Sequence, residues 1–278
     1  MSVLVSYHEN FSIYGYPFLK YRIKPSFQAL QEMIRGGLVK VFEPTITKEI
    51  IQLVDNLHNW QHLRDVKDSG YYEVALLSVA GVVQTAEQLV EGKYQSGFAY
   101  VGAAGHHASP IGFWGFCFLN DVAAAITRLR EMGKERFLIL DVDPHFGDGT
   151  RNFFKHDKKV IHINLYTSKK DHLDKNLNNY DYGLSYNAGD QEFEEVLERA
   201  LARPFEFDMM FVVFGHDSHV LDYGGFALTD AAYPILAQKV KEYTNVRPLL
   251  WVLSGGSKID VASRVIPEIV GILAEFKF

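Results

Sequence analysis

The chain has 278 residues, of which 47% are hydrophobic and 22% charged, a balance typical of a globular protein with a large buried core. A formal net charge of -6 gives no overall attraction to nucleic acid or to an anionic membrane, so neither is expected as a partner. The single cysteine, Cys117, excludes an intrachain disulfide and a thiolate-rich metal site and favours a reducing compartment, which we take to be the cytoplasm. We find neither an apolar run that approaches a membrane span nor a secretory signal.

Short apolar runs alternate along the chain with segments of helical periodicity. In chain order the expected elements are a strand in 2–8, a helix in 71–90, a strand in 97–107, a helix in 120–132, strands in 136–143 and 159–166, a helix in 190–202, a strand in 207–217, a helix in 229–243, a strand in 248–256 and a helix in 261–276. Parallel strands need crossover connections, so this alternation predicts a three-layer αβα protein with a single, mostly parallel sheet. Residues 1–278 contain no repeat or Pro/Ser-rich linker and are expected to form one domain, with the loop-like stretch 167–187 as a mobile lid or a surface connection.

Polar residues follow four of the expected strands, at the end where ligands bind in sheets of this kind. The densest cluster is DVDPHFGDGT at 141–150. Its carboxylates are costly to bury together unless a cation or a proton network occupies them. In an extended chain Asp141, Asp143 and His145 point the same way, and their oxygen and nitrogen donors suit zinc and comparable divalent ions. The alternative is a strand-end turn with aspartate caps and a solvated histidine.

The other strand ends carry motifs that each have an ordinary alternative. His106 and His107 suit proton transfer near neutral pH, although an isolated HH pair is more often a surface or core accident. Asp217 is either a third metal ligand or the cap of the next element. Gly255 and Gly256 either let the backbone approach a ligand closely or form a simple strand-to-helix turn.

Taken together and in this order, GHH, GFCFLND, DVDPHFGDGT, GHDSHVLDYGGFALT and a glycine-rich strand end resemble the histone deacetylase superfamily of metal-dependent amidohydrolases. The resemblance spans most of the chain and implies the arginase/deacetylase fold. Near the amino end, YHENF and YPFLKYRI look like degraded forms of the family's opening motifs. Pro17 and Arg22 are retained there, and Tyr16 replaces an expected histidine.

The resemblance also implies which residues form the site. The implied ligands of Zn²⁺, or of Fe²⁺, which the same donors accept, are Asp143, His145 and Asp217. The implied catalytic residues are His106 and His107, which flank the attacking water, with Asp141 and Asp148 as their respective hydrogen-bond partners. The implied substrate-binding residues are Gly115, Phe116, Gly255, Gly256 and Ser257. A structural K⁺ is implied between Asp141, Asp143 and the backbone around Asn164 and Leu165.

One residue of this set departs from the family's pattern. The family ends this strand in Gly-Gly-Tyr, and the tyrosine hydroxyl donates a hydrogen bond to the oxyanion, whereas this chain has Ser257 followed by Lys258. A serine hydroxyl reaches less far than a phenol, and losing one oxyanion donor typically costs on the order of 10²–10³ in turnover. Three interpretations follow: slow or altered hydrolysis, a replacement donor such as Lys258 or a lid residue, or a metal-binding protein without catalysis.

The implied function is a zinc-dependent, deacetylase-like amidohydrolase in which metal-activated water and a His/Asp general base cleave an acetyl-amide. The expected substrate is acetyl-lysine, an acetylpolyamine or a small N-acetyl metabolite, and self-association is left open. The main alternative is a metal-binding homologue that is catalytically weak or inactive and has a binding or regulatory role. An arginase-like enzyme fits less well, because HDSHVLD lacks the paired aspartates that a second manganese would need.

Overall fold

The structure, a computed structural model, describes residues 2–276, and within them nine strands form one sheet. The strands are β1 (Val3–Ser6), β2 (Val39–Phe42), β3 (Ser96–Ala99), β4 (Phe137–Asp141), β5 (Val160–Thr167), β6 (His172–Asp174), β7 (Asn179–Leu184), β8 (Met209–Phe214) and β9 (Leu249–Leu253). Their order is β2-β1-β3-β9-β8-β4-β5-β7-β6, and every neighbouring pair is parallel except β6 and β7. The predicted α/β class with a single, mostly parallel sheet is confirmed.

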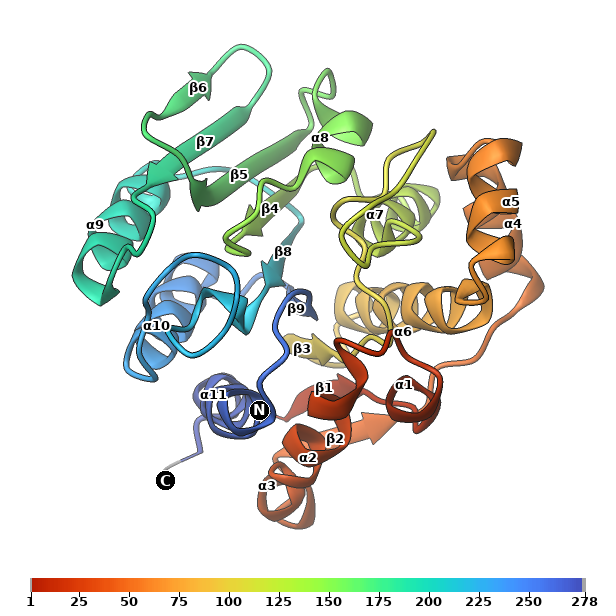
Figure 1. The fold of residues 1–278 in the computed structure, drawn as a ribbon, viewed down its shortest axis with the longest axis horizontal. Helices are drawn as coiled ribbons and strands as arrows, with labels where there is room; N and C mark the ends of the chain where they lie inside the picture. The colour runs from red at the N-terminus through yellow and green to blue at the C-terminus, as the bar shows by residue number, and fades with distance from the viewer. Residues whose placement is uncertain (1, 277–278) are drawn as a thin grey trace.

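Helices cover both faces of this sheet, which runs diagonally between them in Figure 1. On one face α6 (Tyr72–Val90) contacts β1, β3 and β9 and packs against α4 (Lys48–Leu57) and α7 (Asp121–Glu131). On the other face α11 (Ile259–Ala274) contacts β1, and α9 (Asp190–Leu201) contacts β5 and β7. The remaining helices are α1 (Asn10–Ile13), η1 (Lys20–Arg22), α2 (Ile23–Gln28), α3 (Gln31–Arg35), α5 (Trp60–Asp68), α8 (Asp148–Phe154), η2 (His216–Ser218) and α10 (Ala232–Thr244), which packs against α9 and α11.

The helix α6 agrees with the helix predicted in 71–90 but is more apolar than the sequence analysis allowed for. Its 19 residues, with a mean hydropathy of 1.2, have the length and composition of a membrane span, contrary to the expectation that no run approaches one. However, 72% of this segment is buried against the rest of the protein. Its burial is that of a core helix, because the sheet on one side and α4 and α7 on the other leave little of its surface exposed.

A buried asparagine connects several segments that surround the ends of the strands. Asn120 caps α7, because its side-chain oxygen accepts the N–H of Ala123 at 2.9 Å. Its amide nitrogen donates to the carbonyl of Ala108 at 2.9 Å and to the hydroxyl of Thr150 at 3.0 Å. One side chain therefore fixes the start of α7, the segment that follows β3 and the first turn of α8 relative to one another.

The stretch 167–187, expected to be a lid or a surface connection, instead contains β6 and β7, which form an antiparallel pair at the edge of the sheet. Its polar sequence concealed a strand because two of its polar side chains have specific partners. The Asp181 carboxylate accepts two hydrogen bonds from the Arg151 guanidinium, at 3.0 and 2.5 Å. The Asn179 amide donates to the carbonyl of Lys155 at 2.9 Å. The Asp181 carboxylate and the Asn179 amide nitrogen in β7 are thus bonded to α8 and to the residue that follows it, whereas the Asn179 side-chain oxygen is buried without a partner among residues 2–276.

We expect the substitution Arg151→Met to destabilise the fold, because it leaves the Asp181 carboxylate buried without its charged partner and, within the described part of the chain, with only the Asn164 amide, at 3.2 Å, as a donor. The two side chains are only 13% and 6% exposed, and removing one member of a buried ion pair typically costs about 3–5 kcal/mol. Denaturant unfolding measures this change. The control is Arg136→Met, whose ion pair with Glu206 is mostly exposed and is worth about 1 kcal/mol or less. Equal stability of the two variants would contradict a structural role for the Arg151–Asp181 pair.

Candidate active site

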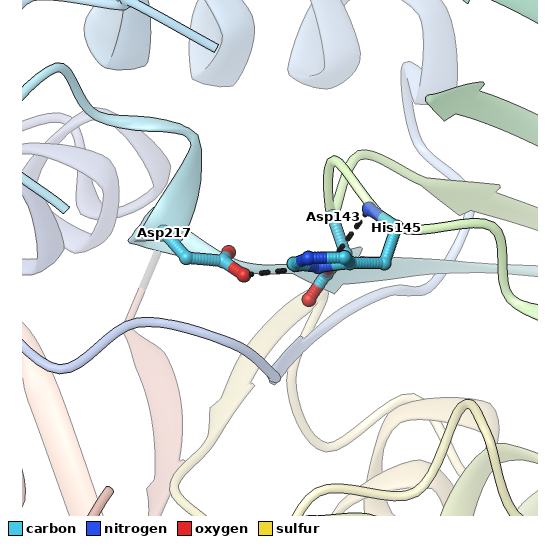
Figure 2. Close-up of side chains that lie close together, drawn as sticks. All are labelled: Asp143, His145 and Asp217. Carbon is cyan, nitrogen blue, oxygen red and sulfur yellow. Dashed lines mark hydrogen bonds and ion pairs between the residues drawn. The ribbon is translucent and has the colours of Figure 1, made fainter. Parts of the chain in front are cut away.

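Three side chains from two strand ends form a group that can hold a metal ion. Asp143 and His145 follow β4, and Asp217 lies in η2 after β8. One ligand atom from each residue lies within 4.8 Å of the others. In Figure 2 the His145 ring lies between the two carboxylates, with its Nδ1 2.9 Å from Asp143 Oδ1 and 3.3 Å from Asp217 Oδ2. The sequence analysis proposed these three residues as ligands, and the structure brings them together.

The hydrogen bonding of the two carboxylates fits a bound cation. Asp143 Oδ2 accepts bonds from the Ser254 hydroxyl at 2.9 Å and the Gly255 N–H at 3.0 Å. Within residues 2–276 both oxygens of Asp217 are buried and have no hydrogen-bond partner, apart from the approach of His145. Burial and the charge of Asp143 raise the pKa of Asp217 to about 7, against the opposing effect of His145. Buried carboxylates that lack donors are typical of a site built for a divalent cation, and Asp, His and Asp suit Zn²⁺ or Fe²⁺.

Two glycines let the ligands approach the backbone this closely. A Cβ atom on Gly215 would lie 2.3 Å from Asp217 Oδ1 and 2.5 Å from Asp143 Oδ2. A Cβ atom on Gly255 would lie 2.3 Å from Asp217 Oδ2. Real Cβ contacts are not this short, so any side chain at these positions would displace the carboxylates.

The two adjacent histidines each pair with an aspartate. His106 Nδ1 lies 3.0 Å from Asp141 Oδ2, and both side chains are almost fully buried. Burial opposes protonation of His106, but the charges of Asp143 and Asp141 outweigh it and raise its pKa to about 9. A cation on Asp143 would offset part of this effect. The structure thus pairs His106 with Asp141, the partner that the family resemblance implied.

The second pair is electrostatically different from the first. His107 Nδ1 lies 2.7 Å from Asp148 Oδ1, and the His106 and His107 rings are 4.0 Å apart. Burial and the neighbouring charge of His106 lower the pKa of His107 to about 4, against the opposing effect of Asp148. His107 is therefore neutral at physiological pH, with Nδ1 committed to Asp148 and Nε2 available to accept a proton.

Trp114 is part of this arrangement and is not among the site residues that the sequence analysis named. Its ring stacks on His107 with a centroid distance of 3.7 Å and an interplanar angle of 26°. Its indole N–H donates to both oxygens of Asp148, at 3.2 and 3.0 Å. Trp114 thus covers the histidine and competes with it for the carboxylate. The only signal in the sequence was its position seven residues after His107 in a glycine-rich stretch.

The metal-ligand group and the histidine pair open onto one cavity of about 250 Å³, which we call the aromatic cavity. Its lining residues are Leu19, Ala104, His106, His107, Trp114, Gly115, Phe116, Asp143, His145, Asp217, Tyr223, Ser254 and Gly255. Phe116 has a φ of 66° after Gly115 at 59°, a left-handed turn that is unusual for a phenylalanine. This turn places the Phe116 ring against two other aromatic rings. Its centroid lies 4.6 Å from the centroid of the Tyr16 ring and 5.4 Å from that of the Phe18 ring.

Two of the expected substrate-binding residues are not in the lining of this cavity. Gly255 lies in it, but Gly256 and Ser257 do not. Gly256 has a φ of 112°, and a Cβ atom there would lie 2.4 Å from the His216 ring. The Ser257 hydroxyl donates to Asp222 Oδ1 at 2.8 Å, and its N–H donates to Asp222 Oδ2, also at 2.8 Å. The role of these two residues in substrate binding stays a prediction, and in the structure their turn is bonded to the loop after η2.

The histone deacetylase domain family matches residues 32–273 of this chain. The chain belongs to the histone deacetylase family. It is 30% identical over 234 residues to histone deacetylase 5 of Arabidopsis thaliana. The aligned region covers 76% of this chain and 35% of that protein. A probable deacetylase of Archaeoglobus fulgidus is 37% identical over 97 residues, which is 35% of this chain and 27% of that protein. This chain thus spans about a third or less of the length of these two relatives.

A solved structure has the same fold as this chain. The crystal structure of the HDA15 HD domain matches this one with a TM-score of 0.85, covering 99% of this chain and 89% of that chain. Sequence identity over this match is 20%, so the likeness shows the shared fold and no more.

We expect Asp217→Asn to abolish tight metal binding in this member of the family without unfolding the metal-free protein, because it removes one of two buried charges and keeps the side-chain shape. Zn²⁺ affinity, measured by chelator competition, should fall by more than about 10²-fold. Even the loss of a residue that only hydrogen-bonds to a metal ligand typically lowers metal affinity by about 10–100-fold. Zn²⁺ at 100 times its Kd should stabilise the wild type by about 2.7 kcal/mol in thermal unfolding, and should not stabilise the variant. Asp68→Asn, at an exposed position, is the control. Undiminished affinity in Asp217→Asn would remove Asp217 from the ligand set.

We expect Trp114→Phe to raise the pKa of His107 from about 4 by about one unit, equivalent to about 1.4 kcal/mol. The variant exposes the imidazole and frees the Asp148 carboxylate to bind it more strongly, and both changes favour the protonated ring. A higher pKa keeps His107 protonated, and unable to accept a proton, up to a higher pH. An NMR titration of the histidine ring protons measures the shift. The exposed Trp60→Phe is the control, and an unchanged or lower pKa in Trp114→Phe would contradict the role of the indole.

Proposed function

We propose that this protein is a metal-dependent, deacetylase-like amidohydrolase that cleaves an acetyl-amide. The observation that carries the proposal is the position of the Asp143, His145 and Asp217 group beside two histidine–aspartate pairs, with both histidines buried in the lining of the aromatic cavity. Membership of the histone deacetylase family supports the same reaction class. Maintaining the fold alone would not require this set of polar side chains, most of them buried, around one cavity.

The ion would be held by Asp143, His145 and Asp217, as Zn²⁺ or Fe²⁺, and when bound it supplies Lewis-acid polarisation of the amide carbonyl and a water of lowered pKa. Asp143 and Asp217 are 1% and 0% exposed, so the ion would be shielded from bulk solvent on that side. The structural K⁺ stays a prediction. The side-chain oxygen of Asn164 already accepts the Gly147 N–H at 3.1 Å, so such an ion would depend mainly on backbone carbonyls.

Proton transfer in this proposal is the task of His107. With Nδ1 on Asp148, its Nε2 takes a proton from the attacking water and later gives it to the departing amine. Asp148 fixes the tautomer and stabilises the imidazolium that forms in between. His106, held by Asp141, lies beside the carboxylate of Asp143, with Nε2 3.7 Å from Asp143 Oδ2, and orients the water on the other side.

The cavity lining favours acetyl-lysine among the expected substrates. Phe116, Trp114 and Leu19 offer an apolar surface suited to the methylene chain of a lysine side chain. An acetylpolyamine carries further positive charges and would favour an acidic group near the entrance. The only carboxylates among the lining residues are the metal ligands Asp143 and Asp217. A small N-acetyl metabolite is the second candidate, because the cavity volume does not require a peptide.

A binding or regulatory role without turnover is the competing function. The position of Ser257 favours it, since this residue replaces the family's tyrosine and its hydroxyl is bonded to Asp222, outside the aromatic cavity. The match covers only 35% of histone deacetylase 5, so partners of the longer relatives are not carried over to this chain. Self-association and a cytoplasmic location stay predictions.

The test measures acetate release from acetyl-lysine peptides, acetylpolyamines and small N-acetyl compounds, with the protein first stripped of metal and then loaded with Zn²⁺ or Fe²⁺. We expect metal-dependent release, greatest for acetyl-lysine peptides, that falls to background in Asp217→Asn. The exposed Asp68→Asn should retain the wild-type rate. A metal-loaded wild-type protein that binds the peptides but releases no acetate from any substrate would contradict hydrolysis and favour the binding role.

A further inference from the structure

Amide hydrolysis needs a hydrogen-bond donor for the negative charge that develops on the carbonyl oxygen, and Ser257 is not placed to supply one. Its hydroxyl and N–H both donate to the carboxylate of Asp222, at 2.8 Å each, and the N–H of Lys258 joins them at 3.0 Å. The turn that contains Ser257 is thus held against the loop that follows η2. If the proposed function is correct, the donor comes from elsewhere.

Tyr223, the residue after Asp222, has the position that this role needs. It lines the aromatic cavity together with the three metal-ligand residues. Its ring centroid lies 6.0 Å from that of His145 and 5.1 Å from that of Phe18. The ring therefore lies beside His145 of the metal-ligand group, on the side of the cavity that the loop after η2 provides.

The hydroxyl of Tyr223 is oriented by the backbone and keeps its own proton available. It accepts a hydrogen bond from the Gly256 N–H at 3.0 Å and, among residues 2–276, has no recorded acceptor of its own. A phenol is protonated at neutral pH, and burial together with the charges of Asp217 and Asp143 raises the pKa of Tyr223 further. Accepting one bond also strengthens the O–H as a donor. The geometry thus leaves a fixed phenol oxygen with a free proton at the edge of the cavity.

We propose that Tyr223 is a catalytic residue that donates a hydrogen bond to the oxyanion of the acetyl group, in place of a side chain at position 257; this inference rests on the proposed function. In the first step the water oxygen forms a bond to the carbonyl carbon, the carbonyl π electrons move to oxygen, and His107 takes the water proton. Tyr223 donates a hydrogen bond to that oxygen and retains its proton throughout. In the second step the oxyanion re-forms the C=O bond, the C–N bond breaks with its electron pair going to nitrogen, and His107 returns the proton to that nitrogen. The remaining hydroxyl proton of the acetic acid passes to the amine, so that acetate and an ammonium group leave.

Asp222 and Ser257 act as positioning residues for Tyr223. The Asp222 carboxylate accepts from two backbone N–H groups and the Ser257 hydroxyl, and His216 Nδ1 approaches it to 3.2 Å. This connection joins the loop after η2 to the turn after β9, whose Gly256 N–H orients the Tyr223 hydroxyl. The serine that replaces the family's tyrosine therefore has a structural reason: its small hydroxyl reaches Asp222, the neighbour of Tyr223.

The experiment compares wild type, Tyr223→Phe and the exposed control Tyr14→Phe, each loaded with Zn²⁺, on an acetyl-lysine peptide. We expect Tyr223→Phe to lower kcat by about 10²–10³, the usual effect of removing one oxyanion donor, with little change in KM. Zn²⁺ affinity by chelator competition and thermal unfolding should match the wild type. Calorimetry should show weaker binding of a peptide trifluoromethyl ketone, which mimics the tetrahedral oxyanion, but unchanged binding of the deacetylated peptide. Tyr14→Phe should change none of these quantities.

A second pair of variants tests the positioning role. Ser257→Ala should lower kcat, because it loosens Asp222, whereas Ser257→Thr keeps the hydroxyl and should restore most of the rate at unchanged Zn²⁺ affinity. An active wild type with undiminished kcat and undiminished ketone binding in Tyr223→Phe would overturn this inference and leave the proposed function intact. A metal-loaded wild type that releases no acetate from any substrate would overturn the proposed function, and this inference with it.

Discussion

The repulsion between two buried carboxylates is the constraint on which this end of the sheet depends. Asp143 and Asp217 are almost inaccessible to solvent, and their oxygens lie close enough for His145 to contact both. In a medium of low dielectric constant, two such charges are stable only beside a compensating cation or after one of them is protonated. The raised pKa of Asp217 is the signature of this conflict in the metal-free protein, and a divalent ion resolves it while both groups stay ionised.

Other features of the site follow from keeping these carboxylates close together. Gly215 and Gly255 leave the space that the two carboxylates occupy, and the Ser254 hydroxyl supplies a donor to Asp143. Arg22, fully buried, donates from its guanidinium to the carbonyls of Ser254 and Gly255 and so brings positive charge beneath the same turn. The amino-terminal segment therefore contributes to the site through a residue that is far from it in the sequence.

The sequence was most informative where chemistry is local. The strand ends, the Asp143–His145–Asp217 group and the two histidine–aspartate pairs could be predicted because motifs after parallel strands must meet at one edge of the sheet. Features that depend on tertiary contacts could not. The strand β7 was hidden because Arg151 compensates its buried Asp181, and the orientation of Ser257 depends on Asp222, which comes from another loop.

The aromatic residues show the same limit. Trp114 directly precedes one of the motifs that the sequence analysis quoted and Tyr223 lies within another, yet neither has a local pattern that separates a site residue from one in the core or at the surface. Their importance comes from their hydrogen bonds. The Trp114 indole N–H donates to Asp148, and the Tyr223 hydroxyl accepts from the Gly256 N–H. For this protein, the residues of the candidate metal-ligand group could therefore be found in the sequence, whereas the side chains that surround them could be found only in the fold.

The most direct test of this account is to locate the ion by anomalous diffraction from a crystal grown with Zn²⁺, collected on both sides of the metal's absorption edge. The account predicts one strong peak per chain, within coordination distance of Asp143, His145 and Asp217 and facing the aromatic cavity. No peak at this group, with zinc bound elsewhere or not at all, would contradict the central claim that these two carboxylates are buried together in order to hold a cation.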